Sequence, residues 1–135
     1  YLELNSVGIG TLLDQVSAAS AVPGLTEGGI SMDALGGHVR DLAPTATAFP
    51  HRTALMTVQY SANFENGADP APFDAYVRGF RSALEPEWGD GAYVNYADAS
   101  LPDPATSYFG DNATRLAAVR AKYDPNGLFT QPQAY

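Results

Sequence analysis

The sequence predicts an α+β fold in which helices pack on one face of an antiparallel sheet. Patterns typical of helix and strand follow one another in the order helix, strand, strand, helix, strand, helix, without the regular alternation of parallel βαβ units. The 135 residues leave room for one domain, and 45% hydrophobic residues with 11% aromatic favour a packed core. No internal repeat or low-complexity linker divides the chain.

Charge and composition exclude several kinds of partner. Fifteen acidic residues against seven basic give a formal net charge of −8, which repels phosphate backbones and anionic lipid surfaces. No apolar run is long enough to span a bilayer. We therefore expect a soluble protein of undetermined compartment that binds neither nucleic acid nor membrane. The chain begins at Tyr1 rather than methionine, which suggests a processed product or a piece of a longer protein.

The N-terminal part predicts one helix and one strand. Apolar residues at helical spacing predict a helix over residues 10–20, which Pro23-Gly24 ends. Residues 26–39 suit a strand that meets a tight turn or bulge at Gly36-Gly37. Residues 42–50 contain two prolines and no periodicity, so they predict an extended loop.

The clearest strand pattern lies over residues 54–64. Apolar and polar side chains alternate there with a period of two, so one face of the strand is apolar and the other mostly polar. The apolar face carries Met56, Val58, Tyr60, Ala62 and Phe64, and the opposite face carries Leu55, Thr57, Gln59, Ser61 and Asn63. The polar face is a candidate wall of a ligand cavity.

The C-terminal half predicts two helices and a third strand. An apolar stripe from Phe73 to Leu84 predicts a helix that Pro86 and Gly89 end. Residues 91–98 predict a short strand, residues 98–107 a loop, and residues 112–122 a final helix with Leu116 and Val119 facing inward. Asn112 matches a glycosylation sequon but also stands where a helix needs an N-cap, and capping by Asp111 or Asn112 is the preferred interpretation.

The predicted strand over residues 91–98 holds the main candidate for chemistry. A period of two places Tyr93 and Asn95 on one face and Val94 and Tyr96 on the other. Tyrosine and valine are also what ordinary half-buried strands prefer, so the pattern alone does not define a site. A phenol is a weak base at its usual pKa of about 10, but neighbouring donors can make it useful in oxidising an alcohol. Such a reaction needs a cofactor to accept the hydride.

Metal and hydrolase chemistry have little support. His38 and His51 are the two histidines of the chain, and neither has a second ligand at metal-binding spacing. No Gly-x-Ser-x-Gly elbow or phosphate-binding glycine loop occurs. We therefore predict no metal site.

Five groups of residues together resemble the C-terminal half of the berberine-bridge-enzyme-like flavin oxidases, in the vanillyl-alcohol-oxidase superfamily. The resemblance covers residues 8–131, and the order and spacing of its motifs are more specific than any one of them. The groups are Leu35-Gly36-Gly37, Thr47-Ala48-Phe49-Pro50-His51-Arg52, Val58-Gln59-Tyr60, Ala92-Tyr93-Val94-Asn95-Tyr96-Ala97-Asp98, and Tyr108-Phe109-Gly110-Asp111-Asn112 with Arg115-Leu116, Val119 and Lys122-Tyr123-Asp124-Pro125-Asn126-Gly127-Leu128-Phe129.

The resemblance implies a fold and a domain organisation. It implies that residues 1–90 belong to a substrate domain whose antiparallel sheet covers the reactive face of FAD. Residues 91–135 would form a berberine-bridge-like segment that returns to an FAD-binding domain outside this chain. FAD would be held mainly by that absent portion, either upstream in the same protein or in a separate chain.

The resemblance also implies roles for individual residues. Tyr93 corresponds to a tyrosine that takes the proton of a substrate hydroxyl while hydride passes to flavin N5, and Asn95 to a neighbour of the flavin ring. Gln59, with Thr57 on the same polar face, is implied to bind a sugar, glycoside or natural-product alcohol. His51 and Arg52 are expected to hold the loop over residues 42–50 against the sheet.

Two departures from the family pattern bear on function. The chain has no cysteine, and its histidines do not match the motif that tethers flavin covalently. We expect the chain alone to be inactive, as one part of an FAD-dependent oxidoreductase. The alternative is a non-catalytic α+β module that binds a small ligand or a partner chain.

Overall fold

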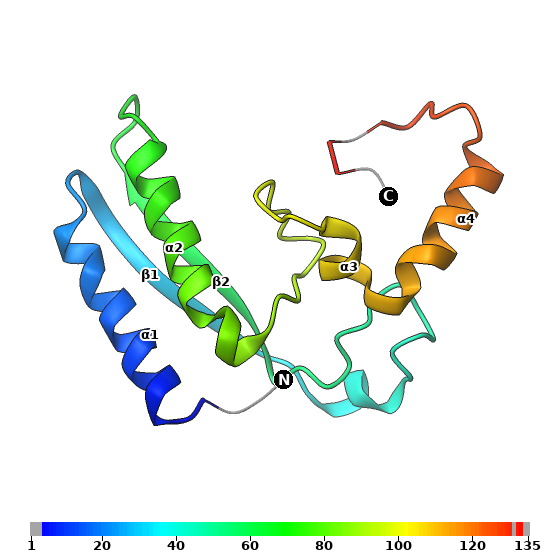
Figure 1. The fold of residues 1–135 in the computed structure, drawn as a ribbon, viewed down its shortest axis with the longest axis horizontal. Coiled ribbons are helices and arrows are strands. Elements are labelled where there is room, and N and C mark those ends of the chain that lie inside the picture. Colours follow the sequence, from blue (N-terminus) through cyan, green and yellow to red (C-terminus); the bar gives the residue numbers. More distant parts are fainter. Residues whose placement is uncertain (1–3, 131, 134–135) are drawn as a thin grey trace. The chain divides into compact units, whose positions relative to one another are not determined.

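The computed structural model describes residues 4–130, 132 and 133. It divides into two compact units. The hairpin unit comprises the residues up to 34 together with residues 55–89, and the loop unit comprises residues 35–54 together with those from residue 90 onward. The predicted α+β class is confirmed, because the sheet is antiparallel and helices are the other regular elements (Figure 1).

The sheet of the hairpin unit has two strands, β1 (Leu25–Ala34) and β2 (Met56–Phe64). They pair with Ile30 opposite Tyr60, which places both side chains on the apolar face that the alternation predicts. The predicted strand over residues 54–64 is confirmed within two residues. The first strand is shorter than predicted, because residues from Gly37 to Asp41 form a 3₁₀ helix after the turn.

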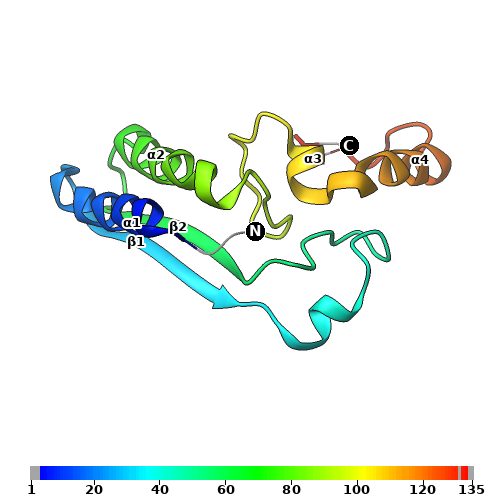
Figure 2. The same cartoon turned by 60° about the horizontal axis from the view of Figure 1, so that its bottom comes forward.

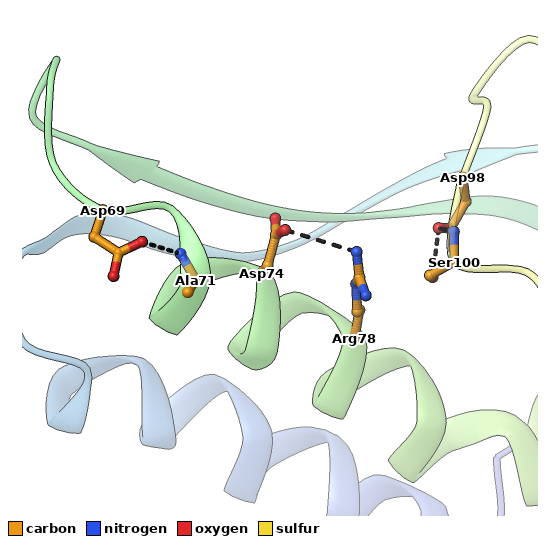
Figure 3. Close-up of polar contacts among 6 residues, drawn as sticks. All are labelled: Asp69, Ala71, Asp74, Arg78, Asp98 and Ser100. Atoms are coloured by element: carbon orange, nitrogen blue, oxygen red, sulfur yellow. Dashed lines mark hydrogen bonds and ion pairs between the residues drawn. The ribbon is translucent and has the colours of Figure 1, made fainter.

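Two helices cover the apolar face of the hairpin (Figure 2). The first, α1 (Ser6–Ala18), begins at Asn5, whose side-chain oxygen accepts from the backbone N–H groups of Val7 and Gly8. A 3₁₀ turn (Ala19–Ala21) follows it. The second, α2 (Ala71–Trp88), begins after Asp69, whose carboxylate accepts from the N–H of Ala71 at 3.1 Å (Figure 3).

Aromatic side chains form the core between α2 and the sheet. Phe80 and Leu84 are fully buried. The ring of Tyr60 on β2 contacts that of Phe80 with 5.1 Å between centroids, and Phe64 stacks on Phe73 at 4.1 Å. Burial also raises the pKa of Tyr60 to about 12, so this phenol is neutral in the core.

The end of α2 differs from the sequence prediction. Pro86 lies inside the helix, which continues to Trp88. Only the last turn follows this proline, and that turn is closed by the Gly89 N–H, which donates to the Glu85 carbonyl at 2.8 Å. Gly89 then adopts a positive φ of 77°, a conformation that glycine tolerates best.

The loop unit contains two helices, α3 (Pro104–Phe109) and α4 (Ala113–Tyr123), joined by a 3₁₀ turn (Gly110–Asn112). The final helix is confirmed, but α3 occupies part of the region predicted as loop. The sequence carries a start signal for α3, an aspartate followed by proline at the first helical position. In the structure Asp103 caps the helix by accepting a hydrogen bond from the Thr106 N–H. Leu116 packs on the small core of Leu101, Tyr108 and Phe109, whereas Val119 is exposed, contrary to prediction.

None of the helices in the described part of the chain combines the length and the apolar character that crossing a membrane requires.

Candidate active site

The segment around Tyr93 is a turn and not the predicted strand. The Tyr96 N–H donates to the Tyr93 carbonyl at 2.8 Å, which closes a four-residue turn with Asn95 at its third position. Asparagine is favoured in such turns, and this preference outweighs the alternating pattern of tyrosine and valine. Beside the turn, the Ala92 N–H donates to the Ser107 carbonyl at 2.9 Å.

The turn brings the two predicted site residues together. The Asn95 side-chain amide donates from Nδ2 to the Tyr93 hydroxyl oxygen at 2.7 Å. Tyr93 is half-buried and Asn95 is exposed. Within the described residues the Tyr93 hydroxyl has no other hydrogen-bond partner. Its own hydrogen is therefore available for an acceptor that comes from outside the chain.

Two aromatic rings contact the ring of Tyr93. Phe49 meets it edge to face with 5.9 Å between centroids, and Tyr96 does so at 5.5 Å. Edge-to-face pairs are attractive because the positive ring edge meets the negative ring face. The orientation of the Tyr93 ring is thus set by neighbours from two separate parts of the sequence.

His51 connects the loop to the residue before Tyr93. Its Nε2 lies 2.8 Å from the Ala92 carbonyl oxygen, which can only accept, so Nε2 carries a hydrogen. Burial lowers the pKa of His51, and hydrogen bonds to the backbone of Ala92 and Tyr108 act in the opposite direction. Burial is the larger effect, and it favours a neutral imidazole.

Arg52 holds the loop together from within. It is buried, and its guanidinium donates to the Val39 carbonyl and to the Thr47 hydroxyl. The same guanidinium lies 5.0 Å from the centre of the Phe49 ring. These contacts support the predicted structural role of the motif within the loop unit, and packing of the loop against the sheet stays a prediction.

Thr57 and Gln59 lie on the polar face of β2, as predicted. Their partners across the ladder are Asp33 and Ser31, so the face away from α1 and α2 carries hydroxyl, amide and carboxylate groups. Thr57 is half-buried and Gln59 is exposed, and neither side chain makes a hydrogen bond within the described residues. These two residues belong to the hairpin unit, whereas Tyr93 and Asn95 belong to the loop unit. A cavity shared by both pairs stays a prediction.

Other polar residues of the loop unit stabilise its backbone. Asp98 accepts from the N–H and the hydroxyl of Ser100 (Figure 3). Asn112 is 5% exposed and donates to the Pro44 carbonyl at 2.9 Å. It stands at the N-cap position of α4 but makes no capping bond with its side chain. Its burial makes the sequon reading untenable for the folded chain.

No group of three histidine, cysteine or acidic side chains suited to a metal ion occurs within the described residues. His38 is exposed and bonds to Asp41 at 2.6 Å, whereas His51 bonds to a backbone carbonyl. The sequence reasoning missed Phe49 as a neighbour of Tyr93. Phe49 stands in a quoted motif, but its contact spans 44 positions of the chain and no local pattern indicates it.

Comparison with known proteins shows which family model and which proteins resemble this chain. Residues 92–134 match the family model described as "Berberine and berberine like". The chain is 33% identical over 101 residues to the FAD-linked oxidoreductase YgaK of Bacillus subtilis, covering 75% of this chain and 22% of that protein. It is 34% identical over 119 residues to a chitooligosaccharide oxidase of Gibberella zeae, covering 78% of this chain and 23% of the oxidase. Residues 92–134 thus form a berberine-like segment, and the chain as a whole is similar to one part of FAD-linked oxidoreductases that include berberine bridge enzyme-like proteins.

A solved structure supports the same assignment for the whole fold. The crystal structure of a glycopeptide hexose oxidase in complex with teicoplanin matches this berberine-like chain with a TM-score of 0.85 and 28% identity. The match covers 98% of this chain and 30% of the oxidase. The berberine-like chain thus spans about a fifth to a third of the proteins that it matches. FAD is the cofactor of this family of oxidoreductases.

Proposed function

We propose that the chain is part of an FAD-dependent oxidoreductase that oxidises a hydroxyl group of a sugar, glycoside or natural-product alcohol. The observation that carries the proposal is the hydrogen bond from Asn95 to the Tyr93 hydroxyl in the berberine-like segment. The relatives named as chitooligosaccharide oxidase and glycopeptide hexose oxidase support a carbohydrate substrate.

Tyr93 acts in this proposal as the general base. Once the Tyr93 hydroxyl has passed its own hydrogen to an acceptor outside the chain, its oxygen can take the proton of the substrate hydroxyl, and the carbon bearing that hydroxyl can then release a hydride and become a carbonyl carbon. The Asn95 side-chain amide, whose Nδ2 lies 2.7 Å from the phenol oxygen, donates a hydrogen bond that stabilises negative charge on that oxygen before the proton arrives. Bound FAD supplies the acceptor for the hydride.

The exposure of Tyr93 and Asn95 is compatible with a position beside the flavin. The phenol is only half-buried and the Asn95 amide is exposed, so both present polar groups at the surface of the loop unit. We propose that Tyr93 and Asn95 border the cofactor, while an FAD-binding portion outside this chain holds most of it. The chain lacks cysteine, so no cysteine of this chain can form a covalent bond with flavin.

Thr57 and Gln59 are proposed to bind the substrate. A hydroxyl and a carboxamide can each donate and accept hydrogen bonds, which suits the hydroxyl groups of a carbohydrate. Both side chains lack a partner within the described residues, so a ligand does not have to displace an existing bond. We assign the polar face of the hairpin to the substrate and the Tyr93 turn to the cofactor.

The proposal is tested by the visible spectrum of the purified FAD-loaded protein under anaerobic conditions. Addition of chitooligosaccharides, glucose oligomers or glycosides one at a time should bleach the oxidised flavin with at least one of them. The bleached sample should regain its colour when oxygen is admitted. A protein that binds a sugar by calorimetry but contains no flavin would contradict the proposal and favour the non-catalytic module.

A further inference from the structure

The ring of Tyr93 is fixed by contacts that the catalytic proposal does not use. Phe49 lies at an interplanar angle of 89° to it, and Tyr96 at 79°. The phenol oxygen of a tyrosine lies on the Cβ–Cγ axis of its ring, so its position depends on the backbone and on χ1, and neighbouring rings that restrain this axis also restrain the oxygen. Phe49 comes from the loop over residues 42–50, far from Tyr93 in sequence.

The backbone that carries Tyr93 is fixed as well. Both polar groups of Ala92 are bonded, its carbonyl to His51 Nε2 at 2.8 Å and its N–H to the Ser107 carbonyl at 2.9 Å. These bonds restrain the peptide unit immediately before Tyr93. His51 therefore acts on the main chain at the point from which the Tyr93 side chain starts.

Phe49 and His51 support one another. Their rings meet edge to face with 5.4 Å between centroids and an angle of 80°. The buried Arg52 guanidinium lies over the Phe49 ring and is itself bonded to Val39 and Thr47. A displacement of Phe49 would therefore break contacts with both of its neighbours in the motif.

We infer that Phe49 and His51 are positioning residues for Tyr93, and that they hold its phenol oxygen where the substrate proton is taken. The inference rests on the proposed function, because it has meaning only if Tyr93 is the base. It adds a role to two residues that the catalytic proposal does not use. Misplacement of a reacting group by about 1 Å can cost roughly a hundredfold in rate.

The first test compares three variants of the FAD-loaded protein by stopped-flow measurement of anaerobic flavin reduction. Phe49→Leu should lower the rate constant at saturating substrate by about 10- to 100-fold. The dissociation constant of the substrate should change by less than about threefold. Phe49→Tyr keeps an aromatic ring and should retain most of the rate. Phe64→Leu removes a comparable ring contact in the hairpin unit and should leave the rate unchanged.

His51 offers an independent variant pair. His51→Leu removes the donor to the Ala92 carbonyl and should slow flavin reduction at saturating substrate. His51→Gln carries an amide donor at a similar distance along the side chain and should recover part of the lost rate. Equal rates in the two variants would overturn the role of the Ala92 bond.

A double-mutant cycle separates positioning from general damage. In a Tyr93→Phe background there is no hydroxyl to misplace, so Phe49→Leu should cost less than about twofold more. The same fold-loss in both backgrounds would overturn the positioning role. If Tyr93→Phe alone leaves the rate unchanged, the proposed base fails. A slow Tyr93→Phe together with a fast Phe49→Leu overturns the present inference only.

Discussion

In the hairpin unit, Phe80 and Leu84 are fully buried between helices and strands, whereas the loop unit adds side chains that bond to backbone carbonyls to a smaller core of Leu101, Tyr108 and Phe109. The first kind of contact is non-directional and depends on apolar area. The second depends on single donors placed at defined points, such as His51 and Asn112. The candidate base Tyr93 lies in the unit that relies on directional bonds, where one substitution can move a side chain without unfolding the protein.

The largest effect on stability should come from the hairpin core. Phe80→Ala removes a fully buried ring and should lower the free energy of unfolding by about 3–5 kcal/mol. Urea unfolding of the FAD-loaded protein, followed by circular dichroism, measures this change. The matched control is Phe64→Ala at a ring that is 37% exposed, which should cost clearly less. Equal losses would show that burial does not distinguish the two rings.

A smaller loss is expected from a directional bond of the loop unit. Asn112→Ala removes the donor to the Pro44 carbonyl and should cost about 0.5–1.5 kcal/mol, because one part-buried hydrogen bond is lost. Asn126→Ala, at an exposed asparagine after α4, serves as the control and should change stability by less than about 0.5 kcal/mol. An equally small change in Asn112→Ala would contradict the importance of these bonds.

The buried histidine predicts a dependence of stability on pH. Burial lowers the pKa of His51 below its usual value of 6.5, so the unfolded chain binds a proton more readily than the folded one. The stabilisation from neutral His51 is complete above pH 6.5 and is lost as the pH falls below it. Unfolding free energies measured from pH 8 to pH 5 should show this decline, and His51→Gln should reduce its slope. An unchanged slope would refute the assignment.

The smallest effect is expected at the surface of the hairpin unit. Asp74 and Arg78 form an exposed ion pair one helical turn apart on α2, with 3.6 Å between charged atoms (Figure 3). Asp74→Asn should cost at most about 0.5 kcal/mol, and the difference should vanish in high salt. A decrease of more than about 1 kcal/mol in the free energy of unfolding would contradict the prediction that exposed ion pairs contribute little to the stability of the hairpin unit.

The same contrast explains what could be predicted from sequence. The strand over residues 54–64 and the helix from Phe73 to Leu84 were predicted because burial imposes a period on the chain. The turn at Tyr93 was missed because its residues alternate like a strand, while a single bond between Tyr93 and Tyr96 closes it. The periodicity of apolar residues predicts which face of an element is buried. It does not predict which donor forms a hydrogen bond with which carbonyl.

The candidate site also has features that the sequence predicted and features that it did not. Tyr93 and Asn95 were expected to point the same way, and they do so through a hydrogen bond in a turn rather than through strand pleating. The support from Phe49 was not predictable, because a contact between distant segments leaves no local pattern. The family motif contained Phe49 and His51, but a motif gives residue types and spacing and no distances. The catalytic and substrate-binding roles of Tyr93, Thr57 and Gln59 stay predictions.

One measurement tests the central claim, that Tyr93 takes the substrate proton, most directly. The rate constant of anaerobic flavin reduction at saturating substrate should be compared between the FAD-loaded protein and its Tyr93→Phe and Tyr96→Phe variants. We predict a loss of roughly 10²- to 10⁴-fold for Tyr93→Phe and little change for Tyr96→Phe, which removes a hydroxyl from an exposed tyrosine in the same turn. A Tyr93→Phe variant that reduces flavin at the unmodified rate would contradict the claim.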